Sequence, residues 1–165
     1  MKRLTVVRHA KSDWSLPDQQ DWDRVLNKRG QRDAPEMARR LRARKLRPDR
    51  ILTSPAVRAL TTATIMAHEL KVNAAHVLQD ERLYLASAPD MLAVVREKGH
   101  DATHLMVFGH NPGITEFVNQ LSAGEQIDNM PTCAIYTLQF AIAAWSELEW
   151  SSGIDADFDY PKRSS

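Results

Sequence analysis

Three short apolar runs, each ending abruptly at a polar or glycine-containing stretch, restrict the fold of this chain more than any other feature. The runs are Leu4 to Val7, Ile51 to Leu52 and Leu105 to Phe108. Nearly continuous apolar and β-branched runs of this length are typical of strands buried on both faces of a parallel sheet. Segments with helical spacing separate the runs, so the sequence predicts an α/β layered domain.

Several helices are indicated by apolar spacing and by residues that start helices. The clearest stripe has apolar side chains at i, i+3, i+4 and i+7, namely Ile114, Phe117, Val118 and Leu121. An earlier helix carries the same spacing at Ala34, Met37, Ala38 and Leu41, and either Asn27 or Asp33 could cap its start. Ser54 before Pro55 predicts a helix that runs to about Leu70, and Ser87 before Pro89 predicts another.

The C-terminal part of the sequence predicts a different pairing. Residues 134–140 and 145–150 have the character of two strands joined by a short turn, so we expect the mostly parallel sheet to gain antiparallel strands late in the chain. The Asp-rich tail from about residue 153 is expected to be irregular. Because no repeat, low-complexity tract or linker divides the 165 residues, a single domain over residues 1–165 is expected.

Composition excludes several classes of protein. The formal net charge is +1, and the single Cys133 cannot form an intramolecular disulfide, which favours a reducing compartment. No apolar run approaches the roughly 18 residues that cross a bilayer, and the N-terminus lacks the apolar region of a signal peptide. We therefore expect a soluble, cytoplasmic protein without a membrane partner.

Basic residues are concentrated in one stretch. Residues 39–50 hold seven Lys and Arg on a predicted helix that also has an apolar stripe. No aromatic residues interleave them, so a solvated helix face is favoured over a nucleic-acid-binding patch.

Charged and imidazole side chains follow each predicted parallel strand. Arg8 and His9 come after the first strand, Arg58 lies one turn into the helix after the second, and His110 comes after the third. The carboxyl ends of parallel strands meet at one edge of a sheet, where helix N-termini also point. Two guanidiniums and two imidazoles at that edge predict an anion site of the phosphate type.

Other kinds of site lack their motifs. The six histidines are scattered, and His100 and His104 at i, i+4 spacing have no accompanying Glu of the zinc-protease kind. No Walker loop, dinucleotide-binding glycine motif or nucleophile elbow is present. We expect neither a metal nor a cofactor.

Five ordered segments resemble the histidine phosphatase superfamily, which has the phosphoglycerate-mutase-like fold, and most closely its SixA-like phosphohistidine phosphatase branch. The segments are VVRHAKSDW at 6–14, LNKRG at 26–30, ILTSPAVRALTTA at 51–63, ERLY at 81–84 and VFGHNPGI at 107–114. The resemblance covers about residues 3–140 and implies a three-layer α/β/α sandwich. Ala10 stands where the superfamily most often has Gly, a change that suits the SixA-like branch.

The resemblance implies a role for each matching residue. His9 would be the nucleophile that forms a phosphohistidine intermediate, and Arg8, Arg58 and His110 would hold the phosphoryl oxygens. Glu81 matches the position of the proton donor in many members. Ser12 and Asn111 would add hydrogen-bond donors to the phosphate.

The sequence leaves more than one class of substrate possible. With little chain beyond the core fold to cover the pocket, a phosphorylated protein side chain, phosphohistidine above all, is favoured over a small phosphometabolite. A phosphomonoester phosphatase or mutase is the first alternative. A non-catalytic module that binds phosphate or nucleic acid is the second, and it is disfavoured because such a module has no need of an in-line imidazole.

Overall fold

The structure is a computed structural model that describes residues 1–163, in which six strands form one mixed sheet in the order β3-β2-β4-β1-β5-β6. The strands are β1 (Lys2–Arg8), β2 (Arg50–Thr53), β3 (Val77–Gln79), β4 (His104–Gly109), β5 (Ile135–Phe140) and β6 (Ile154–Asp159). The α-helices are α1 (Lys28–Ala43), α2 (Val57–Glu69), α3 (Ala88–Lys98) and α4 (Gly113–Leu121). Strands β1 to β4 are parallel, whereas β5 is antiparallel to β1 and β6 to β5.

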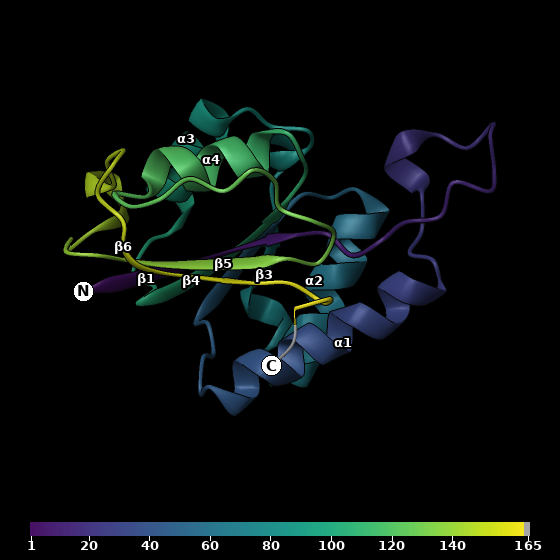
Figure 1. Cartoon of the computed structure of the whole chain (residues 1–165), viewed down its shortest axis with the longest axis horizontal. Helices are drawn as coiled ribbons and strands as arrows, with labels where there is room; N and C mark the ends of the chain where they lie inside the picture. The colour runs from purple at the N-terminus through teal and green to yellow at the C-terminus, as the bar shows by residue number, and fades with distance from the viewer. Residues whose placement is uncertain (164–165) are drawn as a thin grey trace.

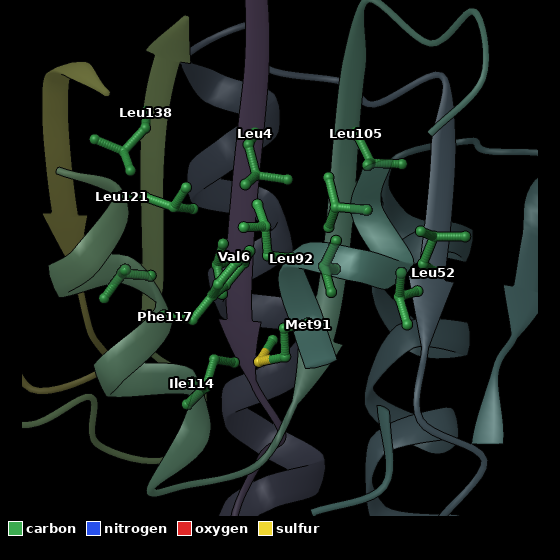
Figure 2. Packing of buried hydrophobic residues seen from close by; sticks show 14 of the residues in the cluster. Leu4, Val6, Leu52, Met91, Leu92, Leu105, Ile114, Phe117, Leu121 and Leu138 are labelled. Atoms are coloured by element: carbon green, nitrogen blue, oxygen red, sulfur yellow. The ribbon is translucent and has the colours of Figure 1, made fainter. Parts of the chain in front are cut away.

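The helices cover both faces of the sheet in pairs. Helices α1 and α2 pack together on one face, and α3 and α4 pack together on the other (Figure 1). Figure 2 shows the core on the α3 and α4 side, where Leu4 and Val6 of β1 face Phe117 and Leu121 of α4. A second buried cluster fills the space beneath α1 and α2. The expected three-layer α/β/α architecture is confirmed.

Polar caps decide where the helices begin. The Asn27 side chain accepts a hydrogen bond from the Gly30 N–H at 2.9 Å, so the first of the two alternatives for the start of α1 is correct. Ser87 caps α3 as predicted. Helix α2 begins at Val57, later than expected, because the Ser54 hydroxyl accepts the Ala56 N–H within the connecting turn.

The C-terminal expectations are only partly correct. Strand β5 is confirmed, but Trp145–Glu147 is a short 3-10 helix, η4, rather than part of a strand. Its Trp145 is buried and its indole N–H donates to the Ala102 carbonyl at 2.8 Å, which fixes a compact turn there. The expectation of an irregular tail is wrong for Ile154–Asp159, which is strand β6, and the tail residues Ser164 and Ser165 lie outside the described residues.

The basic stretch of α1 lies against this acidic strand. Arg40 pairs with Asp159 at 3.1 Å, and Arg44 pairs with Asp157. These ion pairs support an edge strand whose Asp residues have low β propensity, which is why the sequence did not predict it. Within residues 1–163, no helix combines the length and the apolar character needed to cross a membrane.

Candidate active site

Three parallel strands end level with one another at the edge of the sheet that holds the site. Arg8 at the end of β1 is in register with Gly109 at the end of β4, and Thr53 of β2 is in register with Phe108. The residues that follow these strands therefore meet, together with the N-termini of α2 and α4. A cavity of about 300 Å³ opens there, lined by Arg8, His9, Lys11, Ser12, Trp14, Asp21, Arg24, Arg58, Leu85, His110, Asn111 and Thr132.

The His9 imidazole is buried and fixed in one orientation. Its Nδ1 lies 2.8 Å from the Ala10 carbonyl oxygen, and because a carbonyl can only accept, Nδ1 carries the hydrogen. Burial, reinforced by the nearby charges of Arg58 and Arg8, lowers the pKa of His9 to about 3, although the bond to Ala10 opposes this shift. The ring is therefore neutral near pH 7, with a lone pair on Nε2.

The His110 imidazole lies beside His9, with 5.2 Å between the ring centroids. Its Nε2 is 2.8 Å from the Ser54 hydroxyl, which already accepts the Ala56 N–H and is free to donate its own hydrogen. Burial lowers the pKa of His110 to about 3, and the electrostatic effects of neighbouring His9 and Arg58 act in the same direction, whereas Asp21 opposes the shift. A neutral ring that accepts from Ser54 carries its hydrogen on Nδ1 and can donate it.

Three buried nitrogens at this edge have no hydrogen-bond partner among residues 1–163. They are Arg8 Nε, Arg58 Nε and His110 Nδ1. Buried polar groups in native proteins are nearly always paired with protein or water. Because Arg8, Arg58 and His110 all line the same cavity, this cavity is a candidate site for a group that accepts hydrogen bonds. Two guanidiniums and one imidazole match the oxygens of a phosphoryl group.

Asp21 holds the guanidinium of Arg58 in place. The short 3-10 helix η1 (Asp21–Asp23) sets the Asp21 carboxylate 2.9 Å from Arg58 Nη2, and the Asp21 carbonyl accepts from Nη1 at 2.7 Å. The same carboxylate accepts from the Tyr84 hydroxyl and from Arg24. Although burial opposes ionisation, these donors hold the pKa of Asp21 at about 2.

The other three residues predicted for the site, Ser12, Asn111 and Glu81, do not all lie at the cavity. Ser12 lines the cavity, but its hydroxyl accepts from Arg24. Asn111 also lines it, and its amide is occupied by Asn129 and Met130. Glu81 begins the 3-10 helix η3 (Glu81–Leu83), is exposed, and is absent from the cavity lining, so the structure does not bring it together with the others.

Sequence reasoning did not single out Asp21 or Arg24. Both belong to a loop between β1 and α1 that has no apolar periodicity, and Figure 1 shows this loop extending beyond the ends of the strands. The only available signal was the cluster of Asp and Arg in DWDR at 21–24, close in sequence to His9. Among residues 1–163, no group of three or more His, Cys, Asp or Glu is arranged to hold a metal ion.

Comparisons with known proteins identify the family of the chain. A sequence model of the histidine phosphatase superfamily (branch 1) matches residues 4–84. An uncharacterised chloroplastic protein of Arabidopsis thaliana is 31% identical over 92% of this chain and 72% of its own length. An uncharacterised protein of Mycobacterium leprae is 30% identical over 94% of this chain and its own whole length. The chain belongs to the histidine phosphatase superfamily, and this membership supports phosphatase activity.

Several solved structures share this fold. SixA from Agrobacterium tumefaciens aligns with a TM-score of 0.79 and 26% identity, covering 97% of this chain and 98% of that one. The protein histidine phosphatase SixA in complex with tungstate aligns with a TM-score of 0.76 and 20% identity, covering 96% and 94%. A mycobacterial glucosyl-3-phosphoglycerate phosphatase shares the fold at a TM-score of 0.68 and 17% identity, with each chain fully covered.

Proposed function

We propose that this chain is a metal-independent phosphatase, working as a single domain, that removes a phosphoryl group from phosphohistidine on a protein. His9 is the nucleophile, and Arg8, Arg58 and His110 bind the phosphoryl oxygens. One observation carries the proposal: a neutral imidazole with a free Nε2 stands in a cavity where Arg8 Nε, Arg58 Nε and His110 Nδ1 have no partner in the described part of the chain.

The reaction follows from these positions in two displacements. The His9 Nε2 lone pair attacks phosphorus, the bond from phosphorus to the leaving nitrogen breaks, and that nitrogen keeps the electron pair. A water molecule then attacks the phosphorus on His9, which releases inorganic phosphate and restores the imidazole. Charge that develops on the phosphoryl oxygens is met by fixed cationic donors, which is the main requirement of phosphoryl transfer.

The acid–base properties of the cavity favour a nitrogen leaving group. Asp21 is the only carboxylate among the lining residues, and its pKa of about 2 keeps it ionised. An alkoxide leaving group needs a proton from a general acid. A phosphorylated imidazole protonated on its second nitrogen leaves as a neutral ring, so it needs none. The similarity to proteins described as SixA histidine phosphatases supports the same substrate.

Trapping of the intermediate tests the proposal. Incubation with a radiolabelled phosphoramidate should give a phosphoenzyme that is labile in acid and stable in base. His9→Ala should not be labelled, whereas His76→Ala, at an exposed histidine outside the cavity lining, should be labelled like the wild type. Addition of EDTA should leave turnover unchanged.

Four results would contradict it. Label retained in His9→Ala would exclude His9 as the nucleophile, and loss of turnover in EDTA would exclude a metal-independent reaction. Faster turnover of phosphomonoesters than of a phosphohistidine protein would favour the small-molecule alternative. Salt-sensitive nucleic-acid binding without any turnover would favour the non-catalytic one.

A further inference from the structure

Two exposed apolar side chains form part of the cavity wall and have no task in the chemistry described above. Trp14 is 74% exposed and lies in the loop after β1, and Leu85 is 54% exposed and lies between η3 and α3. We refer to these two residues as the apolar rim. Single exposed apolar residues are common on proteins, so the rim needs further support from how its members are held.

The Trp14 ring is held against a buried cation. The Arg24 guanidinium carbon lies 3.5 Å from the Trp14 ring centroid, which is stacking distance. Arg24 is itself buried and is anchored by Ser12 and by Asp21. An aromatic face that is already ordered loses little conformational entropy when a partner covers it, which favours binding.

Leu85 is held in a backbone conformation that leucine seldom adopts. Its φ of 49° lies in the left-handed region, where Gly or Asn would be less strained. Both neighbours are held by contacts of their own: the Tyr84 hydroxyl donates to Asp21, and the Ala86 carbonyl packs against Gly113. Of the seven non-glycine residues with positive φ among residues 1–163, Leu85 is the one that lines the cavity, and backbone strain kept at a cavity is a reason to test the position for function.

We propose that the apolar rim binds apolar side chains next to the phosphorylated residue of a protein substrate. The inference rests on the proposed function, because the phosphoryl group brings the substrate segment into the cavity beside the rim. A small, polar phosphometabolite offers little apolar surface to bury against an indole and a leucine side chain. A polypeptide segment with apolar residues beside its phosphohistidine buries both rim residues while the phosphoryl group reaches Arg8 and Arg58.

Binding of two short peptides tests the inference without turnover. Each carries a non-hydrolysable phosphohistidine analogue, flanked on both sides by Leu in one peptide and by Ser in the other. The wild type should bind the Leu-flanked peptide about tenfold more tightly. Trp14→Ala and Leu85→Ala should lose this preference, measured in each variant as the ratio of its own affinities for the two peptides.

Two further variants separate docking from structural damage. Trp14→Phe keeps an aromatic face for Arg24 and should retain most of the preference. Leu16→Ala is the matched control: Leu16 is 60% exposed in the same loop but is absent from the cavity lining, so the variant should retain the full preference.

Equal affinities of the two peptides for the wild type would overturn the inference, and so would an equal loss of preference in Leu16→Ala and Trp14→Ala. Self-association of the wild type that disappears in Trp14→Ala would assign the rim to a second copy of the chain and would also overturn it. The two proposals fail separately, because the analogue cannot be hydrolysed. A preference without a phosphoenzyme would contradict only the proposed function, and a phosphoenzyme without a preference would contradict only the rim.

Discussion

The Asp21 carboxylate connects side chains from three segments that are far apart in sequence. It accepts hydrogen bonds from Arg24 in its own loop, from Arg58 in the first turn of α2, and from Tyr84 after η3. Both Nη atoms of Arg58 are bound to Asp21, and its buried Nε atom has no hydrogen-bond partner among residues 1–163. Asp21 is therefore a positioning residue for Arg58.

Asp21→Asn should lower kcat/KM by about 10- to 100-fold, because an amide holds the Arg58 guanidinium less firmly and misplacement of a catalytic donor is costly. The loss should fall equally on a phosphoramidate and on a phosphomonoester, as expected for a residue that acts through Arg58. Glu81→Gln is the matched carboxylate-to-amide control and should remain within about twofold of the wild type. Steady-state kinetics with both substrates measures this. A larger loss in Glu81→Gln than in Asp21→Asn would restore Glu81 as the proton donor.

The contrast between these carboxylates shows what sequence could and could not predict about the site. Arg8, His9 and His110 could be predicted from the sequence because each lies at the end of a recognisable buried strand or directly after it, and the register of parallel strands then places them together. Asp21 could not be predicted, because its position depends on the path of a loop without periodicity. Glu81 was named by resemblance alone, and nothing in its local pattern indicated which way the short η3 turn would direct it.

Helix α1 is positioned against the segment that carries the nucleophile by direct backbone contact. A Cβ atom added at Gly30 would lie 2.2 Å from the Lys11 carbonyl oxygen, a separation that no real contact allows. The Asn27 N–H donates to the same carbonyl at 3.0 Å. The start of α1 therefore sets the path of residues 9–12, and with it the orientation of His9.

Gly30→Ala should destabilise the fold by about 1–3 kcal/mol, because the helix and the loop must separate to admit the methyl group. It should also reduce phosphoenzyme formation, since the displaced loop includes His9. Gly124→Ala is the control: its added Cβ would meet the Ser122 hydroxyl at 3.7 Å, an ordinary contact. Chemical denaturation of both variants measures the difference, and equal stabilities would show that α1 shifts without cost.

Sequence patterns predicted those elements whose apolar residues match their burial in the fold. Helix α4 and strands β1 and β4 follow directly from apolar spacing, because their burial matches it. Strand β6 was missed because its sequence, IDADFD, is half acidic and its stability comes from pairing with β5 and from α1. Such tertiary support is not visible in a local window.

The near-zero net charge of the chain conceals two oppositely charged parts that meet in the folded molecule. Residues 1–60 hold 16 Lys and Arg against 7 Asp and Glu, and the remaining residues have the reverse excess. Arg40 shows how the parts meet: it pairs with Asp159 and donates to the carbonyl oxygens of Tyr160 and Pro161. The surplus on α1 thus serves in part to hold the C-terminal segment.

Arg40→Ala should lower the free energy of unfolding by about 1–3 kcal/mol, because three acceptors lose a charged donor. Arg39→Ala, one residue earlier, should cost less than about 0.5 kcal/mol, since Arg39 is half-exposed and its carboxylate partners lie 3.5 and 3.8 Å away. Denaturant titration of the two variants provides the comparison. A similar cost for both would mean that the C-terminal segment is held mainly by the β5 and β6 ladder.

A buried histidine at the opposite end of β4 from the site should make the stability of the whole molecule depend on pH. His104 Nε2 lies 2.7 Å from the Thr5 hydroxyl. Burial, together with the nearby charge of Arg3, lowers the pKa of His104 to about 4, although Arg47 and Asp49 oppose this shift. The unfolded chain, whose histidine has a pKa near 6.5, therefore binds one more proton between about pH 6.5 and 4. This contribution to stability is fully present above pH 6.5 and is lost as the pH falls through that window.

His104→Gln should consequently reduce the slope of unfolding free energy against pH in that window by about 1.4 kcal/mol per pH unit, whatever its effect at pH 7. Thr5→Val removes the hydroxyl partner but keeps the imidazole buried, so it should lower stability while retaining the slope. Denaturant titrations from pH 7 to pH 4 measure both. The slope of unfolding free energy against pH that remains in His104→Gln should come in part from His9 and His110, because burial lowers their pKa values as well. Protonation therefore destabilises both ends of the sheet. An unchanged slope in His104→Gln would show that the pKa of His104 is the same in the folded and unfolded states.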